Sequence, residues 1–119
     1  MKTINLKQKL SMFSETWTPK VISYVDGHQV YLSKLEGDFI WHQHENQDEM
    51  FLVIEGTLNI EFRDSEVTLN PGEMIVVPKG VEHRPHSSEG CSVMVIEDAS
   101  ADHTGGMDDP RRQEKHDHI

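Results

Sequence analysis

The chain has little cysteine, few basic residues and no long apolar segment. Cys91 is the only cysteine among 119 residues, so no intrachain disulfide can form. No apolar run approaches the roughly 18 residues that a membrane-spanning helix needs. Residues 1–5 also lack the apolar stretch of a secretory signal. We therefore expect a cytoplasmic protein without a membrane partner.

The small number of basic residues also argues against nucleic acid as a partner. Lysine and arginine total 11, against 21 aspartate and glutamate residues, which gives a formal net charge of −10. This charge opposes contact with a phosphate backbone, and no basic stripe offsets it. The acidic excess favours solubility and indicates little about a substrate.

Short apolar segments separated by turn-forming residues predict a single all-β domain. The expected strands cover residues 20–25, 28–35, 39–44, 50–54, 57–63, 66–69, 74–77, 83–87 and 91–97. Leu58, Ile60 and Phe62 alternate with polar residues, which indicates one buried face and one wet face. Many short strands at close intervals favour a barrel or sandwich over a βαβ arrangement.

The two ends of the chain differ from this middle part. Leu6, Leu10 and Phe13 have helical spacing, so residues 1–18 are expected to form an N-terminal segment with a short helix. Residues 19–98 would then form the β-barrel. Residues 99–119 are polar and are expected to be a loosely attached C-terminal tail.

The strongest functional signal lies in residues 37–56. His42 and His44 are separated by one residue, so in an extended strand both side chains project from the same face. Glu49 begins the next apolar segment and could return beside the two imidazoles. Two imidazoles and a carboxylate that converge on one point are typical of a first-row transition-metal site. His83, in a later segment, is a fourth candidate ligand.

Around these residues the sequence resembles the paired motifs of the cupins, usually written G(X)5HXH(X)3-4E(X)6G and G(X)5PXG(X)2H(X)3N. The matching positions are His42, His44, Glu49, Gly56, Gly72, Pro78, Gly80 and His83. The chain departs from the pattern twice, because only four residues separate Gly37 from His42 and Ser87 stands where the family has asparagine. The resemblance implies a double-stranded β-helix, or jelly-roll barrel, of the small single-domain type that is often grouped with mannose-6-phosphate isomerase-like proteins.

A metal cofactor follows from the same resemblance. His42, His44, Glu49 and His83 would bind one divalent transition metal, namely Fe, Mn, Ni, Co, Zn or Cu, with Fe or Mn favoured. Three imidazoles and one carboxylate leave two open positions on a six-coordinate metal. Those positions could bind O2, or they could chelate a small-molecule substrate through paired oxygen atoms.

The reaction is less well defined than the site, because cupins include dioxygenases, decarboxylases, isomerases and ligand-binding proteins. We expect an enzyme that oxygenates, isomerises or decarboxylates a small oxygen-rich metabolite. The alternative is a non-catalytic module that binds or senses a small ligand through the metal. A storage-type barrel fits less well, because such proteins commonly lose the ligands that this chain keeps. A committed acid or base near the metal would distinguish enzyme from binder. The candidates by residue type are Glu45, Asp48, Glu82 and Tyr31, and no catalytic residue is assigned.

The other histidines are expected to have structural or surface roles. His28 is interpreted as an exposed residue beside a turn, and His86 as a structural residue or a weak support for the site. Ordered metal coordination is not expected for His103, His116 and His118 in the polar tail. A further set of residues is expected in the core: Phe51, Phe62, Met74, Cys91 and Met94.

One outward face would remain apolar after these assignments. Within residues 49–55, the side chains that point away from Glu49 are also apolar, and Phe39 and Trp41 would add to the same outer surface. A contiguous exposed patch of this kind is unusual on a monomer. We therefore expect a homodimer with Trp41 or Leu52 near the centre of its interface. The alternative is that the same chain covers this face, in part with its N-terminal segment.

Overall fold

The computed structural model describes residues 1–113 and 115–119 and confirms the predicted all-β fold. The elements are α1 (Leu6–Leu10), β1 (Lys20–Val25), β2 (His28–Asp38), β3 (Glu49–Gly56), β4 (Leu58–Phe62), β5 (Glu66–Leu69), β6 (Met74–Val77), β7 (His83–Asp98) and β8 (Asp117–His118). The short helix starts at Asn5, whose side chain accepts a hydrogen bond from the backbone N–H of Gln8 and so caps the first turn. Within the described ranges, no helix is long and apolar enough to cross a membrane.

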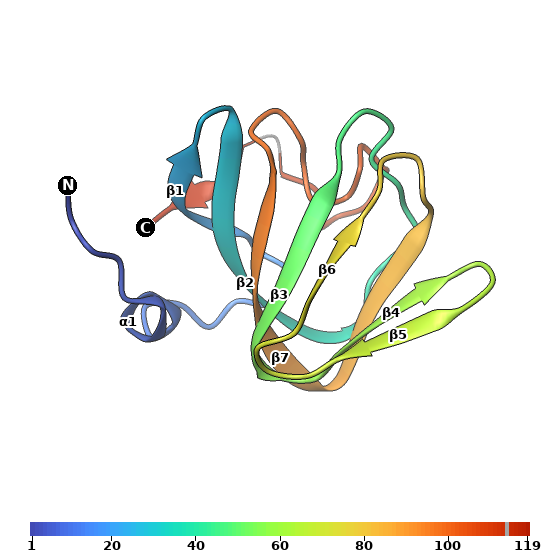
Figure 1. The fold of residues 1–119 in the computed structure, drawn as a ribbon, viewed down its shortest axis with the longest axis horizontal. Coiled ribbons are helices and arrows are strands. Elements are labelled where there is room, and N and C mark those ends of the chain that lie inside the picture. Colours follow the sequence, from blue (N-terminus) through green and yellow to red (C-terminus); the bar gives the residue numbers. More distant parts are fainter. Residues whose placement is uncertain (114) are drawn as a thin grey trace.

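The long strand β7 organises the sheet. One of its edges pairs with β2, and its other edge pairs first with β4 and then with β3. The register against β2 jumps from the Leu35–Cys91 pair to the Gly37–Ser87 pair, so residues 88–90 have no partner in that ladder. Figure 1 shows the result, a bent orange strand with one half beside β2 and β3 and the other half beside β4. The two strands predicted at residues 83–87 and 91–97 are therefore one bent strand.

The strands follow the order β5-β4-β7-β2-β1-β8, and β3 joins β6 to β7 off this path. This pairing leaves the sheet open within the described residues, so the predicted barrel is in fact a curled sheet that does not close. Its inner face carries the main core, which includes Phe51, Val53, Leu58, Ile60 and Val93. Phe51 and Val53 alternate along β3 with half-buried residues, as a strand with one buried face requires.

A second, smaller core lies on the outer face. Leu32 of β2 is fully buried there beneath Leu10 and Phe13 of the N-terminal segment. The helical spacing read from the sequence therefore has a packing role, since it turns these two side chains toward the sheet. The N-terminal segment covers this part of the outer face within the same chain.

The strand predicted at residues 39–44 does not form. β2 ends at Asp38, and beyond it the ladder continues only as an isolated bridge between His42 and His83. The regular alternation of buried and exposed side chains in a strand therefore does not continue through residues 39–44. Phe39, predicted to lie on the outer face, is instead buried in the main core.

Two other side chains lie differently from the prediction. Trp41 is half-buried, and the guanidinium carbon of Arg63 lies 3.9 Å from the centroid of its ring. Met74, predicted to be a core residue, is 55% exposed on β6. By contrast, Cys91 and Phe51 are buried in the core as predicted.

The C-terminal residues pack more closely than a loosely attached tail would. His103, Thr104 and His116 are buried, and β8 pairs in parallel with β1. The side-chain amide of Gln29 donates to the carbonyl oxygen of Ala101 at 3.1 Å. Composition alone did not predict this packing, because the polar residues of the segment find their partners on distant strands.

Gly56 is predicted to be intolerant of any side chain. Its φ is 79°, and a Cβ atom added there would lie 2.4 Å from the carbonyl oxygen of Gly90. Gly72 is a matched control, because its φ is 85° but nothing lies within 4 Å of an added Cβ. In urea unfolding with a chelator present, Gly72→Ala should lose about 1 kcal/mol and Gly56→Ala about 3 kcal/mol or more. Equal losses would show that the close approach to β7 is unimportant.

Candidate metal centre

Four side chains of metal-ligand type meet inside the curled sheet. They are His42, His44, Glu49 and His83, the set predicted from the sequence, and each is at most 5% exposed. Each residue offers one potential ligand atom, a ring nitrogen or a carboxylate oxygen, and these four atoms all lie within 4.8 Å of one another. The sequence prediction therefore identified residues that the fold brings together, although they come from three separate segments.

Backbone hydrogen bonds hold these segments together. Glu49 is the first residue of β3 and His83 the first of β7, whereas His42 and His44 lie in the connection after β2. The backbone N–H of His42 donates to the carbonyl of His83 at 3.0 Å, and the reverse bond is 2.9 Å. Gly80 donates its N–H to the carbonyl of His44 at 2.8 Å. The irregular connection is thus fastened to the start of β7 in place of a regular strand pair.

The rings of His42 and His83 are oriented in the same way. Nδ1 of His42 lies 3.0 Å from the carbonyl oxygen of Ile40, and Nδ1 of His83 lies 3.0 Å from that of Val81. A carbonyl accepts only, so each Nδ1 carries the proton and donates it. Nε2 is then the ring nitrogen of each residue that could bind a metal ion. This pattern, in which one ring nitrogen is anchored and the other is free, is usual for metal-binding histidines.

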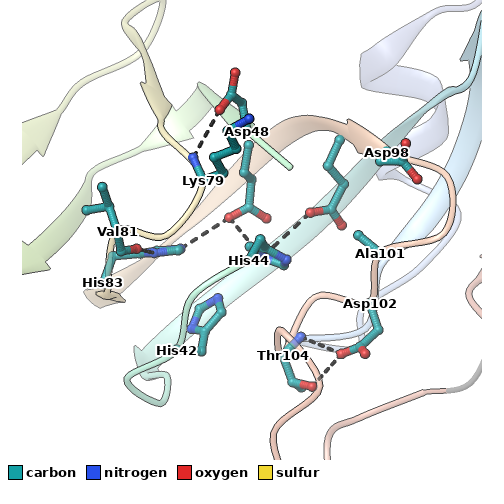
Figure 2. A network of polar contacts seen from close by, with 12 residues as sticks. His42, His44, Asp48, Lys79, Val81, His83, Asp98, Ala101, Asp102 and Thr104 are labelled. Atoms are coloured by element: carbon teal, nitrogen blue, oxygen red, sulfur yellow. Dashed lines mark hydrogen bonds and ion pairs between the residues drawn. The ribbon is translucent and has the colours of Figure 1, made fainter. Parts of the chain in front are cut away.

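The carboxylate of Glu49 lies among the imidazoles. Its Oε1 is 3.2 Å from Nε2 of His83 and 3.4 Å from Nε2 of His44. Burial by itself raises the pKa of Glu49, but the contacts with His44 and His83 outweigh it and hold this pKa well below its usual range. Burial lowers the pKa of His44, and the neighbouring Glu49 carboxylate more than reverses this, so its pKa lies above 6.5. Figure 2 marks these contacts of His44 and His83 with dashed lines and shows His42 close by.

His42 has the opposite electrostatic environment. Burial, and next the nearby His83, lower the pKa of His42 to about 4. His42 is therefore neutral at physiological pH even without a bound ion, which is the form that binds metal.

Glu97 is a site residue that the sequence reasoning missed. It is paired with Glu49 across β3 and β7, it is buried, and its Oε2 lies 3.7 Å from Nε2 of His44. Burial, and next the charge of Glu49, raise the pKa of Glu97 well above its usual range. A signal was present in the sequence, because Glu97 continues the inward-facing series of Cys91, Val93 and Val95 with an acidic residue.

A small cavity lies beside the ligand set. Its volume is about 30 Å³, which is room for about two water molecules. Most of its lining is apolar, and its polar lining residues are Tyr31, Ser33, His42, Glu49 and His103. Burial, and next the charge of Glu97, raise the pKa of the Tyr31 hydroxyl well above 10, so the cavity contains a protonated phenol.

Of the four acid–base candidates named by residue type, only Tyr31 lines the cavity beside the candidate ligands. Glu45 is exposed, Glu82 is exposed and pairs with Arg63, and Asp48 accepts a hydrogen bond from the backbone N–H of Lys79. Figure 2 shows Asp48 beside Lys79, apart from the histidines.

The remaining histidines divide into two groups. His28 is exposed as predicted, and His86 lies 3.0 Å from Glu66 and 3.3 Å from Glu61, away from the four ligands. His103 and His116 are buried and in ring contact with each other, with centroids 5.2 Å apart. These two tail histidines are therefore part of the packed structure, and His103 lines the cavity.

The donor set fits a divalent transition metal. Among the described residues, Nε2 of His44 has no hydrogen-bond partner although it is buried, and the same is true of Oε2 of Glu97. Buried polar atoms without partners are costly, and a cation between the imidazoles and the carboxylate would satisfy His44. Three imidazole nitrogens and one carboxylate suit Fe, Mn, Co, Ni or Zn.

A surface groove lies beside His44. It is lined by His44 and residues 45–47 on one side and by residues 100–102 and Gly105 on the other. The C-terminal segment therefore forms one side of the groove that His44 lines. A Cβ atom added at Gly105 would lie 2.3 Å from the carbonyl oxygen of Gln43, so the segment is seated directly on the connection that carries His42 and His44.

Comparison with known proteins agrees with this arrangement. Residues 29–97 match the family described as the cupin domain. The uncharacterized protein YdbB of Bacillus subtilis (strain 168) is 39% identical over 83 residues, which cover 69% of this chain and 67% of that protein. The crystal structure of a cupin-2 domain protein from Shewanella frigidimarina is 50% identical with a TM-score of 0.80, covering 81% of this chain and 94% of that one. Protein NMB1881 from Neisseria meningitidis is 45% identical with a TM-score of 0.76, covering 82% and 99%.

The buried histidines predict a loss of stability in acid. Burial, and next the neighbouring His116, lower the pKa of His103 to about 4, whereas the unfolded chain has a value near 6.5. The unfolded state therefore binds the proton first, and the stability contributed above pH 6.5 is lost as the pH falls to 4. In metal-free protein, His103→Phe should reduce the fall in unfolding free energy over this range by up to about 3 kcal/mol. If the unfolding free energy fell by the same amount between pH 6.5 and pH 4 in the variant and the wild type, His103 would not be a buried neutral ring.

Proposed function

Because the chain belongs to the cupin family, we propose that it binds one divalent transition metal through His42, His44, Glu49 and His83 and acts on a small oxygen-rich molecule. One observation carries this proposal, the convergence of the four buried ligand atoms within 4.8 Å of one another beside a cavity. Fe or Mn is favoured as the metal. The cupin-like sequence motifs and the buried cluster both support this choice of residues.

The proposed ligands have distinct tasks. His42 and His83 present Nε2 because their other ring nitrogens donate to backbone carbonyls. Glu49 supplies a negative charge that would partly neutralise the cation. A bound metal would act as a Lewis acid and would offer open positions for oxygen ligands. The apolar walls of the cavity would exclude bulk water from those positions, which strengthens the electrostatic interactions there.

We propose an enzyme of the oxygenase, isomerase or decarboxylase type, with a non-catalytic sensor as the alternative. Tyr31 favours the enzyme, because its buried hydroxyl lies in the same cavity as two of the proposed ligands. Reconstitution with Fe(II) under anaerobic conditions, followed by an O2-uptake screen of small hydroxy and keto acids, distinguishes an oxygenase from the sensor. Uptake that depends on both Fe(II) and one of these acids supports an oxygenase. Saturable binding of an acid without turnover supports the sensor.

The metal prediction can be tested at one ligand. His83→Ala should lower the affinity for Mn(II) or Co(II) at least tenfold, because the ligands act together. His86→Ala is the matched control, since it removes an imidazole of the same strand that lies among surface carboxylates. Isothermal titration calorimetry and elemental analysis measure both variants. Full metal occupancy in His83→Ala would refute the four-ligand site.

We also propose a homodimer that uses the outer face of β3 and β6. Met50 is the cross-strand neighbour of Val76, and Leu52 that of Met74. Val76 is 48% exposed and Met74 is 55% exposed, so the four residues form an apolar patch that the N-terminal segment leaves uncovered. A second copy of the chain placed about a twofold axis would cover it. The interface centre moves to Leu52, because Trp41 already packs beneath Arg63.

Light scattering at micromolar concentration tests the dimer. The wild type should have the mass of two chains, and Leu52→Asp should have the mass of one, because a charge in the patch opposes its burial. Thr68→Asp, on an exposed position of β5, is the control and should remain dimeric. A monomeric wild type would refute the dimer. A folded Leu52→Asp that stays dimeric would place the interface elsewhere.

A further inference from the structure

We infer that His103, supplied by the C-terminal segment, donates a hydrogen bond to the small molecule that binds beside the metal centre. The inference rests on the proposed function, because it needs the metal-binding cavity to receive a ligand. It concerns a residue outside the four proposed ligands and outside the matched range 29–97.

The first observation is that His103 is buried without a polar partner. Its side chain is 7% exposed, and within the described part of the chain neither ring nitrogen has a hydrogen-bond partner of good geometry, although the backbone of Trp17 lies close enough to offset part of the fall in the ring's pKa that burial causes. A neutral imidazole has one N–H donor and one acceptor nitrogen, so at least one of these two capacities is unused. Burying such groups costs free energy unless another molecule satisfies them.

The second observation is where the ring lies. His103 lines the same cavity as His42, Glu49 and Tyr31. A molecule in that cavity would therefore have the proposed metal ligands and the unused imidazole within its reach. The other residues of the lining are mostly apolar, which leaves His103, Tyr31 and Ser33 as the polar groups available to orient it.

The third observation is that the ring is held in position from two sides. It stacks on Phe39, with centroids 5.6 Å apart and an interplanar angle of 23°. On another side it meets His116 edge to face, at 5.2 Å and 66°. Asp102, the residue before it, accepts from the backbone N–H of Thr104 at 2.9 Å, and Figure 2 shows this contact close to His44. A ring fixed by aromatic contacts and a closed turn is preorganised, so little entropy is lost when it binds a ligand.

The geometry also limits the ligand. A cavity of about 30 Å³ accepts a group of two or three heavy atoms next to the metal. The donor capacity of His103 then suits an electron-rich end group, such as a carboxylate oxygen or the distal atom of a small anion. Azide is a suitable probe, because it binds to open metal positions at one end and can accept a hydrogen bond at the other.

The experiment measures azide binding to the Co(II)-loaded protein at pH 7.5, by visible absorption and by the infrared stretch of the bound azide. His103→Phe keeps an aromatic ring against Phe39 but removes the donor. We expect it to bind Co(II) as the wild type does, to bind azide about tenfold more weakly, and to shift the azide stretch. His103→Gln, which retains an N–H donor, should recover part of the affinity. If the Phe variant does not fold, His103→Leu replaces it.

His116→Phe is the matched control. It is a buried tail histidine that contacts His103 but does not line the cavity, so its substitution should leave the azide stretch unchanged. Wild-type protein that takes up no Co(II) would overturn the proposed function and this inference together. A folded His103→Phe or His103→Leu that binds Co(II) and azide with wild-type affinity and stretch would overturn the inference alone.

Discussion

The buried carboxylate of Glu49 is the constraint on which the rest of the site depends. Removing a carboxylate from water costs several kcal/mol unless partners compensate for the lost hydration. His44 and His83 provide that compensation, and their contacts outweigh burial in setting the pKa of Glu49. The neighbouring carboxyl of Glu97 cannot also ionise easily, because it is buried and because two adjacent buried negative charges repel. The arrangement therefore favours one charged and one protonated carboxyl in the absence of a cation, and a bound cation would change that balance.

Much of the site could be predicted from the sequence because its signals are local. His42, His44 and Glu49 are close in sequence, so their convergence with His83 could be predicted although the strand at residues 39–44 was not. The failure concerned long-range contacts. Phe39 lies inside because the ladder beyond β2 continues only through a single bridge to β7. The pattern of apolar residues along a sequence does not indicate such pairing between distant segments. The open edge of the sheet was beyond prediction for the same reason.

The C-terminal segment shows the limits of composition as a guide. A polar sequence of Asp, Gly, Arg and His predicts weak attachment, since it offers little apolar surface to bury. Here the imidazoles themselves provide that surface, through ring contacts of His103 with Phe39 and of His116 with Tyr31. Histidine can serve in this way because its neutral ring is largely apolar in its faces, and burial favours the neutral form. The same burial leaves ring nitrogens unsatisfied, which an apolar residue in that position would not.

The packing of these imidazoles connects the C-terminal segment to the site that it covers. The segment is seated on residues 42–44, so its position and the orientation of two proposed ligands depend on the same contacts. Attachment through aromatic faces with unsatisfied nitrogens is weaker than attachment through a complete hydrogen-bond network, because each orphan nitrogen subtracts from the gain of burial. A molecule in the cavity that satisfies His103 would remove that cost. Ligand binding and packing of the segment would then stabilise each other, without any contact between the ligand and the rest of the tail.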